Sequence, residues 1–222
     1  MIQLTKKIIV ILIFTFGIGL SSYGQTRSQD SIKKKDTVGL KYNFKHSQRG
    51  TLFLADTTIN TNPNAEDLAE ICEMTYKLVK MFGMNPNVAM LSYSNFGSSK
   101  QPTAQKIRKA VSYIHENYPH VVVDGELQAD FALNPEMLAK EFPFSKLNGK
   151  KTNVLIFPNL ESANITYKLL KEVYKAESLG PIILGFSKPV HVMQLGASVD
   201  EMVNMAALAV VDAQEKERRK MK

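Results

Sequence analysis

The most constraining feature of this sequence is a pattern in which a short apolar run ends in a polar loop and a helical segment follows. Residues 153–157, NVLIF, are apolar and β-branched, which is typical of a buried strand. Pro158 ends this run, because a proline cannot donate to a continuing strand ladder. Small polar residues fill positions 159–164, and apolar residues then recur at helical spacing, at Ile165, Leu169 and Val173.

This stretch predicts a strand, a polar turn and a helix whose N-terminal N–H groups face the carboxyl edge of a sheet. Anionic ligands bind at that edge in open α/β sheets. The alternative is an ordinary strand-to-helix connection whose turn satisfies itself.

The same pattern repeats along the chain and predicts an α/β fold. Further strands are expected at residues 51–55, 88–93, 120–123, 181–186 and 189–193. Helices are expected at residues 64–82, 103–117 and 134–142, and a closing helix begins at the Ser198–Glu201 capping box, with an apolar side of Met202, Met205, Ala206, Ala209 and Val210. Alternating strands and helices imply a mostly parallel sheet covered on both faces.

The charge distribution argues against a nucleic-acid partner. The chain of 222 residues has a net charge of +7, but residues 1–50 carry nine Lys/Arg against two Asp. Residues 216–222 form a basic tail with five Lys/Arg against one Glu. Residues 51–215 hold fourteen basic and eighteen acidic residues, so the folded part is mildly acidic. A nucleic-acid binder would place its basic residues on the folded face.

Residues 1–24 resemble a signal peptide and predict export to the periplasm or the exterior. Lys6 and Lys7 precede an apolar run over 8–20, which is too short to span a bilayer comfortably, and small residues precede Gln25. An uncleaved anchor and a misassigned start are the alternatives, and no other membrane contact is expected. Residues 25–49 are polar without periodicity, which predicts a disordered linker. The folded domain is expected over 50–215.

Cysteine and histidine usage favours neither a disulfide nor a metal. The single cysteine, Cys72, lies on the apolar face of the predicted helix over 64–82, which indicates a buried core thiol. The histidines at 46, 115, 120 and 191 lack metal-ligand spacing. No metal site is therefore predicted.

Two polar loops are the candidate ligand site. The loop over 94–100 combines serine hydroxyls, backbone amides and a lysine, which suit a phosphate or a carboxylate, although it is not a Walker A motif. The predicted ligand residues in the two loops are Ser94, Gly97, Ser98, Ser99, Asn159, Ser162 and Asn164. Acidic residues after the strand over 120–123, including Asp124 and Glu126, suggest either acid–base or cation chemistry or simply acids at a helix N-terminus.

Several blocks occur in the order of a known family. They are ADTTINTNPNAEDLAEI, NVAMLSYSNFGSSK, VDGELQADFALN, NVLIFPNLESANITYKLL, GPIILGF and KPVHVMQLGASVDEMVNMAALAVVDAQ. Together they resemble the second half of the phosphate acetyl/butyryltransferase family, most closely the version fused to bacterial NADP-dependent malic enzymes. The resemblance covers roughly residues 45–214. It implies a three-layer α/β/α fold of the isocitrate/isopropylmalate dehydrogenase type, and acyl transfer between coenzyme A and phosphate in a cleft between two α/β domains.

The resemblance also shows departures at the expected catalytic positions. Active transferases have Ser-Arg-Gly before the closing helix and an aspartate early in it. The matching residues here are Gln194, Leu195, Gly196 and Glu201. Leucine has no charge and no donor, and losing such a donor commonly costs a factor of about 10² or more in rate. Gln194 and Gly196 remain candidate ligand contacts. Glu201 either takes the role of the family's aspartate, with a carboxylate on a longer side chain, or closes the capping box.

The resemblance implies three possible functions. The first is a catalytically impaired regulatory module of malic-enzyme type that binds acetyl-CoA or phosphate, without a covalently bound cofactor and with possible homo-oligomer contacts. The second is an active phosphate acyltransferase whose site is completed by another subunit. The third is a folded remnant without a function of its own. The family works in the cytoplasm, which conflicts with the export prediction.

Overall fold

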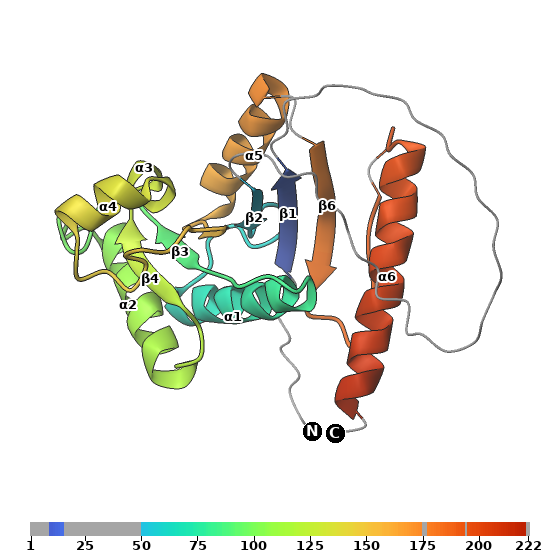
Figure 1. The fold of residues 1–222 in the computed structure, drawn as a ribbon, viewed down its shortest axis with the longest axis horizontal. Helices are drawn as coiled ribbons and strands as arrows, with labels where there is room; N and C mark the ends of the chain where they lie inside the picture. The colour runs from blue at the N-terminus through green and yellow to red at the C-terminus, as the bar shows by residue number, and fades with distance from the viewer. Residues whose placement is uncertain (1–8, 16–49, 175–176, 194, 221–222) are drawn as a thin grey trace.

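The computed structural model describes residues 9–15, 50–174, 177–193 and 195–220, and these form an α/β fold (Figure 1). In chain order the elements are β1 (Ile9–Thr15), β2 (Thr51–Ala55), α1 (Ala65–Met81), β3 (Val88–Leu91), α2 (Pro102–Asn117), β4 (Val123–Leu127), α3 (Ala129–Leu133), α4 (Pro135–Glu141), β5 (Val154–Ile156), α5 (Leu160–Tyr174), β6 (Glu177–Leu184) and α6 (Val199–Lys220). The strand order in the sheet is β4-β3-β5-β2-β1-β6. Strands β4, β3, β5 and β2 are parallel, whereas β1 runs antiparallel to both β2 and β6.

The sheet has a hydrophobic core on each face, as the period-two geometry of a strand requires. In β2, Phe53 and Ala55 belong to the core that α1, α2 and α6 cover. Leu52 and Leu54 of the same strand belong to the core beneath α3, α4 and α5. This is the predicted three-layer α/β/α arrangement with a mostly parallel sheet.

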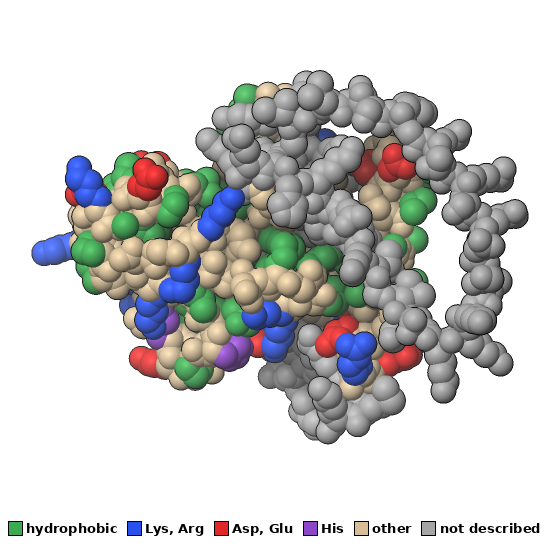
Figure 2. All heavy atoms as spheres, viewed as in Figure 1, with side chains coloured by type: hydrophobic (Ala, Val, Ile, Leu, Met, Phe, Trp, Pro, Cys, Tyr) green, Lys and Arg blue, Asp and Glu red, His purple; other side chains and the backbone are tan. Residues whose placement is uncertain are grey.

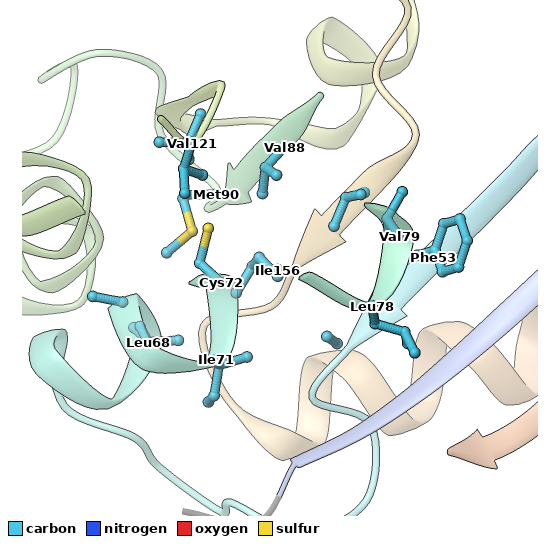
Figure 3. Packing of buried hydrophobic residues seen from close by; sticks show 14 of the residues in the cluster. Phe53, Leu68, Ile71, Cys72, Leu78, Val79, Val88, Met90, Val121 and Ile156 are labelled. Atoms are coloured by element: carbon cyan, nitrogen blue, oxygen red, sulfur yellow. The ribbon is translucent and has the colours of Figure 1, made fainter. Parts of the chain in front are cut away.

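Helix α1 forms because its apolar residues recur on one side and its N-terminus is capped. Asn64 accepts a hydrogen bond from the N–H of Asp67 at 2.8 Å, and the Asp67 carboxylate accepts from the N–H of Asn64 at 3.1 Å. Cys72 is fully buried on this helix, as predicted, and points toward Met90 in the core (Figure 3). Burial raises the pKa of the Cys72 thiol, with a smaller contribution from Glu73.

The prediction for β4 was wrong in its position. The sequence placed a strand at residues 120–123, but β4 begins at Val123 and continues through Leu127. Asp124 and Glu126 are therefore buried inside the strand rather than exposed beyond its end. They are tolerated there because neighbouring loops supply donors: for Asp124 these are the Ser145 hydroxyl at 2.8 Å and the Lys146 N–H at 2.7 Å.

Gly125 permits the close approach of β4 to β3. Its φ of +149° lies where side chains are strained, and a Cβ at this position would lie 2.6 Å from the carbonyl oxygen of Met90. The Asp-Gly-Glu sequence, which suggests a turn, instead marks a place where two strands come unusually close.

The C-terminal third also departs from the sequence interpretation. Strand β6 covers 177–184 and ends where Gly185 turns the chain at a φ of +100°. The second strand predicted at 189–193 does not form, and these residues pair with no strand of the described sheet. Helix α5 does not bury the predicted positions: Ile165, Leu169 and Val173 are exposed, whereas Ala163 and Tyr167 are buried. On α6, Met205 is buried as expected, together with Leu208, but Met202 and Val210 are about half exposed.

The N-terminal apolar run contributes a strand. Residues 9–15, inside the predicted signal segment, form β1, with Leu12 opposite Leu54 of β2 and Val10 opposite Ile183 of β6. The rest of the predicted signal segment and the predicted linker lie outside the described residues. The basic tail continues α6 as far as Lys220.

The surface of the described part is mixed in character. Acidic and basic side chains are interspersed on the face that Figure 2 shows. Among the helices that the structure describes, none is long and apolar enough to cross a bilayer.

Candidate functional site

The loop over residues 92–101 between β3 and α2 is closely hydrogen-bonded at the carboxyl edge of the sheet. The Ser94 and Ser98 hydroxyls are 2.9 Å apart, and the Ser99 N–H donates to the Ser94 oxygen at 3.0 Å. Phe96 and Gly97 have positive φ angles of 41° and 94°. Successive amides turned in this way resemble the backbone nests that bind anions, and we call this part of the loop the nest. That the loop binds a phosphate or a carboxylate stays a prediction.

A side chain of the protein itself occupies this nest. The buried Glu126 carboxylate accepts the Ser94 hydroxyl at 2.7 Å and the Gly97 N–H at 3.0 Å, both at Oε1. The Phe96 N–H donates to the Glu126 backbone carbonyl at 2.9 Å. Arg108 of α2 pairs with the same Oε1 at 2.5 Å and also donates to the Ser99 carbonyl at 2.9 Å. Glu126 and Arg108 thus hold the loop from both sides.

The outer side of the loop presents hydroxyl groups. Tyr93, which is 56% exposed, has its hydroxyl 2.9 Å from that of Ser99 and 3.5 Å from that of Thr103. Hydrogen bonding to Ser99, and then to Thr103, lowers the pKa of Tyr93. Ser98 is also exposed, but its hydroxyl is held inside the loop, 2.9 Å from the Ser94 hydroxyl and accepting the Asn95 N–H at 3.0 Å. A phosphate approaching from solvent would meet the Tyr93 and Ser99 hydroxyls before it met the nest.

The second predicted loop, between β5 and α5, is tied to the loop after β2. Asn164 donates from Nδ2 to the Thr57 carbonyl at 3.2 Å. Lys106 of α2 donates to Asn62 Oδ1 at 2.8 Å and to the Pro158 carbonyl at 2.9 Å, and partial burial lowers its pKa. These contacts bring a cation between two strand-end loops.

Asn159 and Ser162 have a local structural role. The Ser162 N–H donates to Asn159 Oδ1 at 2.9 Å, and the Ser162 hydroxyl donates to the Asn159 carbonyl at 3.0 Å. This is the N-cap geometry of α5. The alternative that the turn satisfies its own polar groups therefore describes much of this loop.

The segment before α6 lies in a different environment. Leu195, Gly196 and Glu201 line a small cavity of about 100 Å³ together with Tyr167 and Lys171 of α5, and its lining includes no residue of the 92–101 loop. Glu201 closes the capping box, accepting the Ser198 N–H at 2.7 Å and donating its own N–H to the Ser198 hydroxyl at 3.2 Å. Leu195 is fully exposed. Gln194 lies outside the described residues.

Sequence reasoning missed Arg108, Lys106 and Tyr93. A signal for Arg108 was present, since it stands four residues after Ala104 and one after Ile107, on the side of α2 that packs against the sheet. A charged residue at an inward position needs a buried partner. The sequence singled out that partner, Glu126, but in another role.

Fold and site together define a class of protein. A mostly parallel sheet with hydroxyl- and amide-rich loops at its carboxyl edge is typical of α/β proteins that bind small anionic ligands. Residues 27–210 match the family described as phosphate acetyl/butaryl transferase, and the chain belongs to this family.

Individual relatives agree with this assignment. The chain is 46% identical over 167 residues to the NADP-dependent malic enzyme of Escherichia coli, covering 74% of this chain and 22% of that protein. It is 42% identical over 173 residues to the phosphate acetyltransferase of Acetivibrio thermocellus, covering 78% and 52%. The structure of a phosphotransacetylase from Streptococcus pyogenes superposes with a TM-score of 0.76 at 29% identity, covering 96% of this chain and 56% of that one. The chain thus spans about half of the transferases and about a fifth of the malic enzyme.

Proposed function

We propose that this chain is a transferase-family module that binds acetyl-CoA or phosphate and has lost most of the transfer activity, with a regulatory role of malic-enzyme type. The observation that supports this most directly is the contrast between two segments. The 92–101 loop keeps an ordered set of hydroxyl and amide groups. The segment before α6 has an exposed Leu195 at the position where the family resemblance implies an arginine.

The use of Glu201 also supports impaired catalysis. A general base must reach the proton that it removes, and here the carboxylate holds the Ser198 N–H at 2.7 Å. Loss of both the guanidinium and a correctly placed carboxylate would lower the rate far more than it lowers ligand affinity, because transition-state charge would lose its stabilisation.

An active phosphate acyltransferase is the second candidate. It is favoured by the 42% identity to the phosphate acetyltransferase of Acetivibrio thermocellus. In that case another subunit would supply the missing donors, since this chain spans 52% of that enzyme. A folded remnant that binds nothing is the third possibility.

A thermal melt of the full chain with acetyl-CoA, and separately with inorganic phosphate, tests the proposal. Ligand at about 100 times its dissociation constant adds roughly 2.7 kcal/mol of stability, which raises Tm by about 5–10 °C in a domain of this size. The S98A/S99A double variant should lose most of this shift, whereas S112A, on the exposed side of α2, should keep it.

The remaining outcomes separate the three candidates. Acetyl phosphate formed from acetyl-CoA and phosphate at an ordinary enzymatic rate would favour the active transferase. A cooperative melt that no ligand moves, together with no turnover, would contradict both binding proposals and leave the remnant.

A further inference from the structure

The loop over 92–101 adopts an anion-binding conformation around a carboxylate that belongs to the protein. Two successive N–H groups with turned backbone, those of Phe96 and Gly97, end on Glu126, at its carbonyl and at Oε1 respectively. The Ser94 hydroxyl and the Arg108 guanidinium reach the same Oε1. These are the donor types that would surround a bound phosphate or carboxylate.

We propose that Glu126 is the positioning residue of this loop, a built-in anion that holds it in ligand-binding geometry before any ligand arrives. On this view an external anion meets the hydroxyls of Tyr93 and Ser99 on the outer side of the loop, while the nest behind them stays occupied by Glu126. The ligand-binding part of this inference rests on the proposed function; the structural part does not.

Because Glu126 is buried, its carboxylate matters for the stability of the loop. Glu126 is fully buried, and its second oxygen, Oε2, has no hydrogen-bond partner in the part of the chain that the structure describes. Such a charge persists only where its counter-charge and donors are fixed, and Arg108, whose side chain is 30% exposed, provides the counter-charge. Removing the carboxylate would therefore leave donors and a cation around an empty space.

The position of Arg108 explains how the loop is held at both ends. Its Nη1 contacts Glu126 behind the first half of the loop, and its Nη2 contacts the Ser99 carbonyl in the second half. One guanidinium thus connects α2, β4 and the loop. A lysine could not make both contacts, because it lacks the planar fork of donors.

The test is chemical rescue of Glu126→Ala by a small anion. We expect E126A to lower Tm by about 10 °C, since a guanidinium is left without its partner. Formate at about ten times its dissociation constant should restore about 3–5 °C, whereas chloride at equal ionic strength should not. E116A, which removes an exposed glutamate from the same helix as Arg108, should neither lose stability nor respond to formate.

Glu126→Gln provides a second measurement that does not depend on rescue. The amide fills the space but is a weaker acceptor, so we expect faster hydrogen exchange at Gly97 and Ser99 with little change in α1. Formate should have no effect on E126Q because the space is occupied. If E126A does not fold, hydrogen exchange of E126Q still tests the positioning role of Glu126.

The outcomes separate this inference from the proposed function. Unchanged exchange in E126Q, or an E126A protein that folds but does not respond to formate, would overturn the positioning role. Rescue of E126A together with a wild-type chain that binds neither phosphate nor acetyl-CoA would keep the positioning role and overturn the proposed function. If the positioning role and the proposed function are both correct, E126Q should weaken phosphate binding at least threefold.

Discussion

His191 is a residue whose titration should affect stability. Both of its ring nitrogens are buried without a hydrogen-bond partner in the described part of the chain. Burial lowers the pKa of His191, and Lys216 lowers it further, while Asp212 opposes them. Because the pKa in the folded state lies below that of the unfolded chain, which is about 6.5, the unfolded chain binds the proton more readily.

The predicted consequence is a loss of stability in mild acid. The contribution of neutral His191 is fully present above about pH 6.5 and decreases as the pH falls toward its lowered folded-state pKa. Thermal melts between pH 7.5 and 5.5 should show a smaller fall of Tm for H191Q than for the wild-type chain. H120Q, at an exposed histidine, should follow the wild type. Identical pH profiles for H191Q and wild type would contradict this prediction.

Single residues also show where sequence reasoning reached its limit. Cys72 and its neighbours on α1 were placed correctly, because a 3.6-residue period over five turns has few other interpretations. Glu126 was noted only as one of the acidic residues after a strand and was misplaced, because the sequence Asp-Gly-Glu resembles a turn. Only the tertiary contacts to Ser94, Gly97 and Arg108 reveal that a strand can bury that carboxylate.

At the level of elements, strand β1 has a testable role in the sheet. Among the described strands, β6 pairs with β1 and with no other. Cleavage before Gln25, as the signal-peptide interpretation predicts, would remove β1. Strand β6 would then lose the strand with which it is hydrogen-bonded, and β2 would become an edge strand of the sheet.

Hydrogen exchange of the full chain and of residues 25–222 tests this role. We expect residues 51–55 and 177–184 to lose protection in the shorter chain, while β3 and β4, which do not pair with β1, keep theirs. Equal protection in both chains would show that β1 contributes nothing to the sheet. An intact-mass measurement of the expressed protein then reports whether residues 1–24 are retained in cells.

Most of the alternation of strands and helices was predictable, whereas the strand over 9–15, the missing strand over 189–193 and the faces of the last two helices were not. Periodicity identified α5 and α6, but it cannot tell which apolar positions a helix buries when apolar residues lie on more than one side. In α5 the buried residues are Ala163 and Tyr167, and the predicted Ile165 is 66% exposed. One apolar side of α5 therefore remains at the surface of the molecule.

At the scale of the whole molecule, the described part of the chain exposes several apolar side chains on α5 and α6, and contiguous exposed apolar surface commonly marks a contact with another molecule. Ile165, Leu169 and Val173 on α5 and Val199 and Val203 on α6 are each at least 60% exposed. The apolar sides of α1 and α2, by contrast, are buried. We therefore predict that two copies of this chain associate through the exposed apolar side of α5 that Ile165, Leu169 and Val173 form.

Sedimentation velocity across a concentration series measures this association. We expect the wild-type chain to dimerise in the micromolar range and I165E/L169E to shift the equilibrium toward monomer by at least tenfold, because charges in an apolar interface must be desolvated. L133E, which places the same charge at an exposed leucine of α3, should behave as the wild type. A wild-type chain that sediments as a monomer at every concentration would contradict the prediction. Equal weakening by both variants would instead place the contact away from α5.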